Sequence, residues 1–300
     1  MVRKKCDKII DFILLFFAII PIIGIIILQI LTKPEATGIT VEGARIYFTI
    51  PMPLQPLPIT ESQVNSFAVL ITIFSLCLYL TRNMNTKKPT KRQHLAEWIV
   101  EKCDGLVKDN MDPYFKNFGP FIAAILGLSA FSSLLSLFGL FPPTSDINIV
   151  GGWAILVFIL ITYYKFKCGP LHYAKSFCDP PLLTPLNIIS EIATPISMAF
   201  RHYGNILSGS VISVLLATGL AGLSSLVLGW LPGFLGDIPL LRIGIPAVLS
   251  IYFDVFSGAL QAFIFAMLTM MYVSGGFPAE DFAARRLRLS KANKDKTFGG

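Results

Sequence analysis

Residues 186–230 read LNIISEIATPISMAFRHYGNILSGSVISVLLATGLAGLSSLVLGW, and this stretch decides the fold class. It is almost wholly apolar or small, and it contains one carboxylate, Glu191, and one guanidinium, Arg201. A helix needs about 20 apolar residues to cross the bilayer core of about 30 Å. The stretch is therefore long enough to form a membrane helix with residues to spare.

The rest of the chain has the same character. Hydrophobic residues make up 54% of the 300 residues and charged residues 14%, and the mean hydropathy is +0.67. Soluble domains carry about 25% charged residues, so a soluble chain of this length could not bury so much apolar surface in one core. The composition excludes soluble, disordered and disulfide-stapled proteins. It indicates an all-α polytopic membrane protein.

We expect six membrane helices. The segments that supply them are 12–31, 64–80, 118–140, 151–164, 186–230 and 245–274. The first could be a signal peptide, but no small-x-small cleavage site follows it, so we expect an uncleaved anchor. The last two segments are expected to form a long antiparallel hairpin, with its turn at residues 231–233.

Lys and Arg residues gather in alternate connections between these spans. With the N-terminus inside, the inner connections carry 21 of the 25 Lys and Arg residues and the outer ones carry 3. The inner connections are 1–8, 82–117, 165–185 and 274–300, and the outer ones are 32–63, 141–150 and 230–244. Positive charge concentrates in cytoplasmic loops. The net charge of +7 therefore indicates that both termini are cytoplasmic, rather than that the chain binds nucleic acid.

The chain divides into three regions: an N-terminal anchor helix with an outer loop (1–63), a membrane domain (64–274) and a basic cytoplasmic tail (275–300). The outer loop is expected to be extended because proline cannot occupy a helix interior; its prolines are Pro51, Pro53, Pro56 and Pro58. An amphipathic helix is expected on the inner membrane surface before the third span. Its apolar positions are Leu95, Trp98, Ile99, Cys103, Leu106 and Val107.

Several kinds of site have no support in the sequence. The five cysteines are odd in number and form no CxxC pair, and three histidines accompany them. This pattern predicts neither a metal site nor a disulfide framework. No GxxxxGK[ST] phosphate loop is present. We therefore expect no cofactor, no metal and no nucleic-acid partner.

Three ionisable side chains lie inside the last two spans: Glu191, Arg201 and Asp254. Such residues are costly in a membrane and usually functional. Arg201 lies about 22 Å along a helix that begins near residue 186, at 1.5 Å per residue. It cannot easily reach either surface, and its guanidinium does not deprotonate.

Polar residues form a seam on each of these two helices, at steps of three or four residues. The seams are Ser190, Thr194, Ser197, Arg201, Asn205 and Ser208 on the first helix, and Ser250, Asp254, Ser257 and Gln261 on the second. Packing between membrane helices explains the hydroxyl groups equally well. It does not explain Arg201 and Asp254.

Residues at one depth of an antiparallel hairpin have a constant sum of residue numbers. The sum is 462 for Arg201 with Gln261 and 464 for Ser210 with Asp254, so each pair is expected to be level. Asp254 is then nearer the outer face, and Glu191 lies about 15 Å to the inner side of Arg201. Arg201 is thus a fixed cation with one acidic residue toward each membrane surface, Asp254 on the outer side and Glu191 on the inner side. This arrangement is expected if an ion uses two half-pathways that are offset from each other.

The residues around Arg201 resemble those of a known family. The motif FRHYGN at 200–205 resembles the R-L-F-G-N motif of subunit a of F-type ATP synthases, although His202 and Tyr203 depart from it. Residues 260–269 (LQAFIFAMLT) are similar to that family's last-helix signature, and residues 143–148 (PTSDIN) to its P-[ST]-x-D-[LIV]-N stretch. The likeness extends over about 64–274. The sequence assigns His202 no role.

This resemblance implies an ion-translocating stator subunit that is not catalytic alone. It implies a rotating ring of c subunits as the main partner, with b-type peripheral stalk subunits, the rest of the ATP synthase and membrane lipid around it. It also implies a multi-pass protein of the bacterial plasma membrane.

The resemblance further implies roles for single residues. Arg201 corresponds to the essential arginine of the family, with Asn205 and Gln261 as its polar partners. Asp254 lies where relatives carry Glu or His, and Ser210 lies where many of them carry a carboxylate. Asp254 is therefore expected to serve the outer side alone.

The mechanism implied is electrostatic. An ion, most simply a proton, with sodium left open, enters from outside past Asp146, Asn148 and Asp254 and neutralises a carboxylate of the c ring. After nearly a full turn the carboxyl group releases its proton on the side of Glu191. Arg201 keeps the passing carboxylate ionised and blocks a direct leak between the half-channels. Ion flow is thereby coupled to ATP synthesis.

Two other classes stay open. One is a secondary transporter or channel with a buried Arg–Asp pair, although the chain has no paired repeat of interrupted helices. The other is a structural assembly protein whose buried charges serve helix packing. Co-purification with a small, ring-forming hydrophobic subunit would separate these readings.

Overall fold

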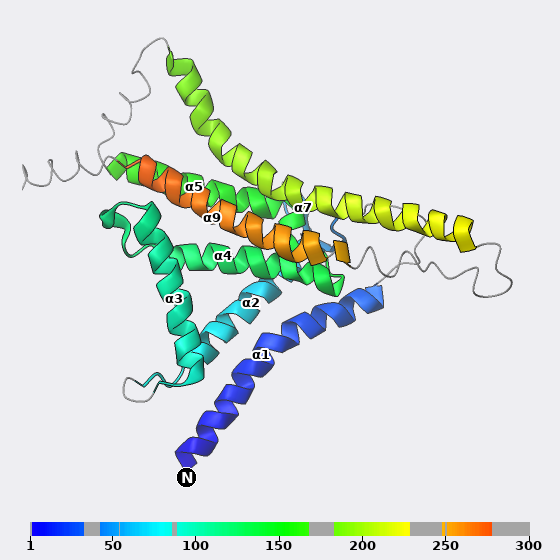
Figure 1. Ribbon diagram of the computed structural model, residues 1–300, viewed down its shortest axis with the longest axis horizontal. Helices are drawn as coiled ribbons and strands as arrows, with labels where there is room; N and C mark the ends of the chain where they lie inside the picture. The colour runs from blue at the N-terminus through cyan, green and yellow to red at the C-terminus, as the bar shows by residue number, and fades with distance from the viewer. Residues whose placement is uncertain are drawn as a thin grey trace, which may run out of the picture.

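The computed structural model of the chain is a bundle of long helices (Figure 1). It describes residues 2–32, 43–53, 55–85, 89–167, 183–228, 248–249 and 251–277. The expected hairpin turn at 231–233 and the tail from residue 278 lie outside the described residues.

Within the described residues, six helices are long and apolar enough to cross a membrane. Five of them consist mainly of one element each: α1 (Val2–Thr32), α2 (Glu61–Thr81), α4 (Gly119–Leu134), α5 (Ile147–Lys167) and α7 (Thr184–Leu228). The sixth combines a π-helical turn, η5 (Ile251–Ser257), with α9 (Gly258–Gly275), and a 3-10 turn, η2 (Leu135–Phe138), extends α4. The predicted all-α class and six spans are confirmed.

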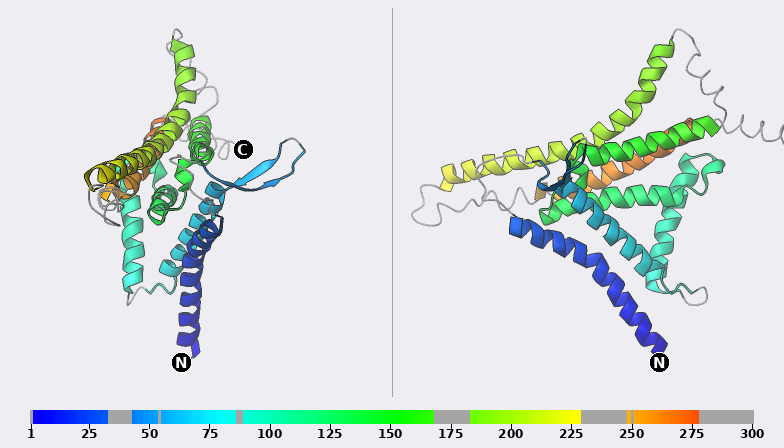
Figure 2. Two further views of the ribbon diagram at one scale, coloured as in Figure 1. Left: turned by 90° about the vertical axis from the view of Figure 1, so that its right-hand side faces the viewer. Right: turned by 180° about the vertical axis from the view of Figure 1, so that it is seen from behind.

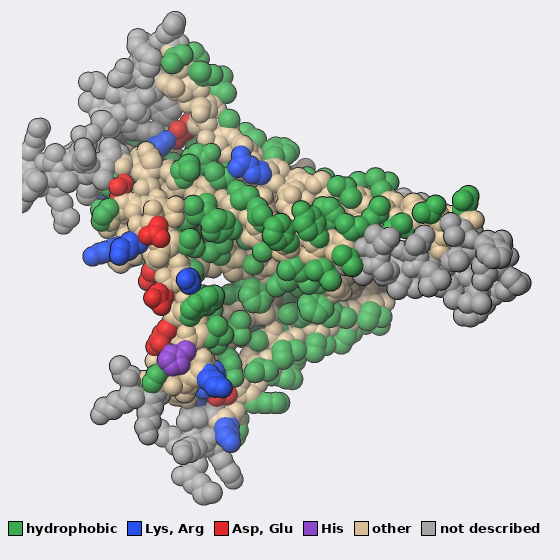
Figure 3. Space-filling view, viewed as in Figure 1, with side chains coloured by type: hydrophobic (Ala, Val, Ile, Leu, Met, Phe, Trp, Pro, Cys, Tyr) green, Lys and Arg blue, Asp and Glu red, His purple; other side chains and the backbone are tan. Residues whose placement is uncertain are grey.

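The helix bundle has two ends, which differ in the elements that lie there. Helices α4, α5 and α9 run side by side, and α7 crosses them and continues beyond the bundle (Figures 1 and 2). Helix α3 (Lys91–Asn110) lies across one end, which we call the α3 end. The other end, where a β-hairpin precedes α2, we call the hairpin end. Charged side chains gather at the α3 end, whereas the flanks of the helices are covered by hydrophobic side chains (Figure 3).

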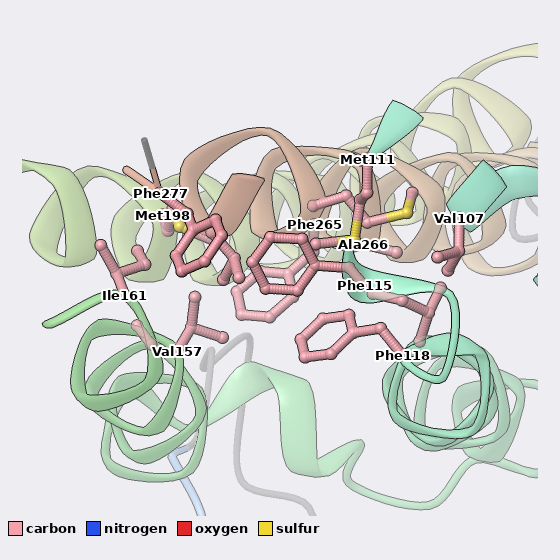
Figure 4. Close-up of a cluster of buried hydrophobic side chains, with 14 of the residues drawn as sticks. Val107, Met111, Phe115, Phe118, Val157, Ile161, Met198, Phe265, Ala266 and Phe277 are labelled. Atoms are coloured by element: carbon pink, nitrogen blue, oxygen red, sulfur yellow. The ribbon is translucent and has the colours of Figure 1, made fainter. Parts of the chain in front are cut away.

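The main core cluster lies toward the α3 end and joins five helices (Figure 4). Its labelled members are Val107, Met111, Phe115, Phe118, Val157, Ile161, Met198, Phe265, Ala266 and Phe277. The ring of Phe115 meets those of Tyr164 and Phe277 edge to face, at centroid distances of 4.9 and 5.3 Å, a favoured aromatic geometry. This cluster fixes α7 and α9 against α4 and α5.

Gly258, at the start of α9, allows a close approach to α4. A Cβ atom on Gly258 would lie 2.6 Å from the Cβ atom of Ser133, which is closer than two carbon atoms can pack. The approach fixes η5, the turn just before Gly258, beside α7. It therefore positions Asp254 and Ser257 of η5.

Helix α1 packs along α2 and is attached at three levels. At the α3 end, the guanidinium of Arg92 donates to the carboxylate of Asp11 at 3.0 Å. Midway, the hydroxyl of Thr72 donates to the carbonyl of Ala18 at 3.0 Å, and at the hairpin end the amide of Gln29 donates to the carbonyl of Gly139 at 2.7 Å. The predicted anchor is therefore an integral part of the bundle.

The proline-rich outer loop forms two strands. Strands β1 (Ile46–Ile50) and β2 (Leu57–Thr60) pair antiparallel and project from the bundle (Figure 2). The sequence predicted extended backbone here but not its pairing. Pro58, opposite Thr49, is tolerated because each strand of a two-stranded sheet has a free edge.

Helix α3 confirms the predicted amphipathic helix but divides its apolar residues between two faces. Cys103 and Val107 are buried against the bundle, whereas Leu95 and Trp98 are 49% and 56% exposed. The helix begins at Thr90, whose hydroxyl accepts from the backbone N–H of Gln93, as N-cap residues do. One face thus packs on protein, and the other presents an apolar stripe.

Candidate functional site

A cavity of about 620 Å³ opens at the hairpin end of the bundle. Helix α7 contributes Ser210 to its wall, and η5 contributes Asp254. Ser136 of η2 and Ser145, just before α5, also line it. The cavity therefore holds a half-buried carboxylate among hydroxyl groups, inside a bundle whose flanks are hydrophobic.

The contact between α7 and η5 has the register expected from the sequence. The side-chain amide of Asn205 donates to the hydroxyl of Ser257 at 2.8 Å. A Cβ atom on Gly209 would lie 3.3 Å from the ring of Phe253. Both pairs have residue numbers that sum to 462, so the antiparallel alignment is confirmed. Ser250, the first member of the second predicted seam, lies outside the described residues.

Ser210 and Asp254 line the same cavity, as their predicted common depth requires. The hydroxyl of Ser210 donates to the carbonyl of Leu207 at 2.8 Å, one turn back along its own helix. Serine hydroxyls do not ionise near neutral pH. Of these two side chains, Asp254 is therefore the one with a carboxylate.

Arg201 lies on the outward surface of α7. Its side chain is exposed, and α7 has no other Lys or Arg. Figure 3 shows an isolated basic patch on α7, surrounded by hydrophobic side chains. The exposed face extends along the predicted seam, because Ser190, Ser197 and Ser208 are exposed too. Within the described chain, these three hydroxyls do not join α7 to another helix.

Arg201 has no ion-pair or hydrogen-bond partner among the described residues. Gln261, which was predicted to be level with it, is 4% exposed and lies inside the bundle. Asp254 lines the cavity instead of pairing with Arg201. The buried Arg–Asp pair expected of a secondary transporter is therefore not formed by the described residues.

His202 points to the opposite side of α7 and is fully buried. Its Nε2 atom lies 3.3 Å from the hydroxyl of Ser129 on α4. Its ring meets those of Trp153 and Phe265 edge to face, at 6.1 and 5.5 Å. This residue, for which the sequence predicted no role, packs α7 against α4, α5 and α9.

Glu191 lies at the α3 end and forms an ion pair that the sequence did not predict. Both of its carboxylate oxygens accept from the ammonium group of Lys165, at 2.6 and 2.7 Å, and both side chains are about one-fifth exposed. Lys165 is in the last turn of α5, and Glu191 is near the start of α7. The sequence signal that could have predicted this ion pair is the presence of opposite charges near the same end of two successive spans.

Asp146 and Asn148 lie outside the lining of the cavity, although the sequence placed them on the entry path. The carboxylate of Asp146 accepts from the backbone N–H of Asn148 at 2.9 Å and from the hydroxyl of Ser62. Asp146 thus caps the first turn of α5, as acidic residues commonly do, and ties it to α2. The side chain of Asn148 is exposed.

Three other cavity residues were not predicted as site residues: Gln29, Arg45 and Glu61. The backbone N–H of Glu61 donates to the carbonyl of Arg45 at 2.7 Å, and Glu61 is 4% exposed. Burial, followed by the negative charge of Glu61, raises the pKa of the nearby Tyr47 hydroxyl, and the charge of Arg45 opposes this. The sequence signal that could have identified Glu61 as a site residue is its place as an acidic residue in the first turn of a membrane helix.

Comparison with known proteins gives consistent matches. A family model described as ATP synthase A chain matches residues 64–274. A protein named ATP synthase subunit a from Priestia megaterium is 35% identical over 236 residues, which cover 73% of this chain and 93% of the relative. The like-named protein from Anoxybacillus flavithermus is 34% identical over 68% of this chain and 86% of its own length. That from Legionella pneumophila (strain Paris) is 26% identical, over 76% and 91%.

Proposed function

The chain belongs to the ATP synthase subunit a family, and from this membership we propose that it forms two offset ion half-channels beside a ring of c subunits. As a member, it is a multi-pass, ion-translocating membrane subunit of ATP synthase and not a catalyst by itself. The half-channels, the ring and the direction of ion flow form the proposal.

The exposed charge of Arg201 is the observation that carries this proposal. A guanidinium stays charged at all relevant pH values, and a charge facing hydrocarbon costs several kcal/mol unless it is paired. The described residues offer Arg201 no partner, and the surface around it is hydrophobic. The missing partner is therefore a carboxylate on another subunit, which a c subunit supplies from within the membrane.

The cavity with Asp254 serves as the outer half-channel. A proton that enters it reaches Asp254 and then the carboxylate of a c subunit. Once neutral, that carboxyl group can face lipid at tolerable cost, so the ring can turn. A potential of 100 mV contributes about 2.3 kcal/mol per charge to this motion.

The inner half-channel lies on the side of Glu191. A carboxyl group that returns toward Arg201 loses its proton, because a nearby cation favours the ionised form. The proton leaves toward the α3 end, where Glu191 is paired with Lys165. Arg201, between the two pathways, blocks a direct leak.

The orientation and the partners belong to the same proposal. The α3 end and both termini are cytoplasmic and the hairpin end faces outward, in line with the bias of Lys and Arg toward inner loops. The exposed apolar stripe of α3 with Leu95 and Trp98 lies against lipid. Regions 1–63, 64–274 and 275–300 act as anchor and outer loop, channel domain and cytoplasmic tail. A b-type peripheral stalk holds the subunit still.

Replacement of Arg201 tests the function. In membrane vesicles that contain the whole ATP synthase, Arg201→Ala should abolish ATP-driven proton pumping and proton-driven ATP synthesis while the complex still assembles. Arg201→Lys should fail nearly as fully, because an ammonium group can deprotonate and lacks the planar fork. Ser190→Ala, on the same exposed face, is the matched control and should remain coupled. Normal coupling in Arg201→Ala would refute the assignment.

A further inference from the structure

The outer cavity is built partly by residues that lie outside the family match. The match begins at residue 64, yet Gln29, Arg45 and Glu61 line the cavity together with Ser210 and Asp254. Gln29 is fixed by its hydrogen bond to the carbonyl of Gly139. The N-terminal segment therefore supplies part of the wall of the cavity that Asp254 also lines.

Glu61 has the properties of a group that exchanges protons with this cavity. Its side chain is more than nine-tenths buried within the protein, and it lines the cavity wall. Among the described residues, no hydrogen bond or ion pair satisfies its carboxylate. A buried carboxylate without such partners is costly, so water in the cavity must solvate it. A volume of about 620 Å³ has room for roughly 20 water molecules at about 30 Å³ each.

The wall around Ser210 explains why a second carboxylate is useful here. The hydroxyl of Ser210 is bonded to the carbonyl of Leu207 and cannot take up a proton near neutral pH. Among the described residues, the ionisable groups that line the cavity are Arg45, Glu61, Tyr203 and Asp254. Of these, the two carboxylates are the groups suited to exchange a proton near neutral pH, since a guanidinium stays protonated and a phenol ordinarily ionises near pH 10.

We propose that Glu61 is a second proton-carrying residue of the outer half-channel, held at its entrance by the N-terminal segment; this inference rests on the proposed function. The carboxylate of Glu61 accepts a proton from hydronium in the cavity and becomes a carboxylic acid. It then returns the proton to cavity water, which passes it to the carboxylate of Asp254.

The test measures ATP synthesis in liposomes that contain the whole ATP synthase, driven by an imposed proton gradient. Glu61→Gln should lower the initial rate severalfold, while subunit content and ATP hydrolysis by the detergent-solubilised complex stay normal. Glu61→Asp should retain most of the rate. Glu97→Gln, which removes an exposed carboxylate on α3, is the matched control and should leave the rate unchanged.

A rescue variant separates proton transfer from a structural role. Ser210→Glu adds a carboxylate to the same cavity, so the double variant Glu61→Gln with Ser210→Glu should recover part of the rate. If Glu61 only stabilises the first turn of α2 through the helix dipole, the added carboxylate restores nothing. Any of three results would overturn the inference. They are no recovery in the double variant, a normal rate in Glu61→Gln, and failure of Glu61→Gln to assemble. Arg201→Ala, measured in the same liposomes, tests the proposed function independently of Glu61.

Discussion

At the scale of single residues, Arg201 and His202 show how one helix serves two purposes. Successive residues of a helix are about 100° apart around its axis, so neighbours can have opposite surroundings. Arg201 is exposed without a partner among the described residues, whereas His202 is buried against Ser129, Trp153 and Phe265. The packing of His202 thereby fixes the rotation of α7 about its axis in which Arg201 is exposed.

Asp254 gives the first prediction at this scale. Asp254→Asn should strongly reduce proton uptake from the outer side, because the variant loses the carboxylate of the proposed outer half-channel. Adding Ser210→Glu should restore part of the uptake, since both side chains line one cavity. Proton-driven ATP synthesis in liposomes measures both effects, with Ser210→Gln added to Asp254→Asn as the control. A double variant no better than Asp254→Asn, in a normally assembled complex, would show that the two positions do not share a pathway.

Glu191 gives the second prediction, and its ion pair changes what should be measured. Glu191→Gln should slow coupled transport without stopping it, because water can share proton transfer near the inner face. It should also lower the thermal stability of the complex, since it removes the ion pair between Glu191 and Lys165. Both groups retain contact with solvent, so the loss should be near the 1 kcal/mol typical of partly exposed pairs.

A double-mutant cycle separates the two roles of Glu191. Glu191→Gln combined with Lys165→Gln should recover stability but not transport. If transport recovers together with stability, Glu191 serves only to hold α5 against α7. Turnover and the Tm of the detergent-solubilised complex are the two measurements needed.

At the scale of elements, the approach of α9 to α4 sets the geometry of the cavity. The π-helical turn η5 ends directly before this contact, and such turns often occur at functional sites. Gly258 is the position that permits the contact, because any side chain there would overlap Ser133. The position of Asp254 therefore depends on a residue that is not in the lining of this cavity.

Gly258→Ala is the prediction at this scale. The added methyl group should displace α9 and η5, cost about 1–3 kcal/mol of stability as overpacking does, and impair coupling. Ser133→Gly in the same chain removes the opposing Cβ atom and should restore both. Gly152→Ala, where an added Cβ meets nothing within 4 Å, is the control. An unaffected Gly258→Ala complex would mean that the contact is looser than described.

The helices and the register could be predicted from the sequence because both depend on local pattern. Apolar run lengths predicted the spans, and equal sums of residue numbers predicted that α7 and η5 align as Asn205 and Ser257 show. The pairing of Lys165 with Glu191 and the position of Glu61 in the cavity depend on how separate helices pack. No local pattern encodes such contacts. The place of Asp146 and Asn148 on an entry path stays a prediction, beside the observed role of Asp146 at the start of α5.

At the scale of the whole molecule, two regions meet around one cavity. The helices after residue 64 supply Asp254 and Ser210, and the segment before it supplies Gln29, Arg45 and Glu61. Helix α1 is held along α2 by contacts near both of its ends. The exposed face of α7 then remains as a surface that a partner subunit must cover.

The central claim is that this face of α7 contacts the c ring, and disulfide cross-linking tests it most directly. Cysteine at Ser208 or Ile212, both exposed on the side of Arg201, should cross-link to a cysteine on the outer helix of a c subunit at matching depth. Cysteine at Phe12 of α1, which is 72% exposed but lies on a helix packed against α2, should not. Cross-linked a–c products are expected from the two α7 positions alone. Products from Phe12 alone, or from none of the three positions in an assembled complex, would contradict the central claim.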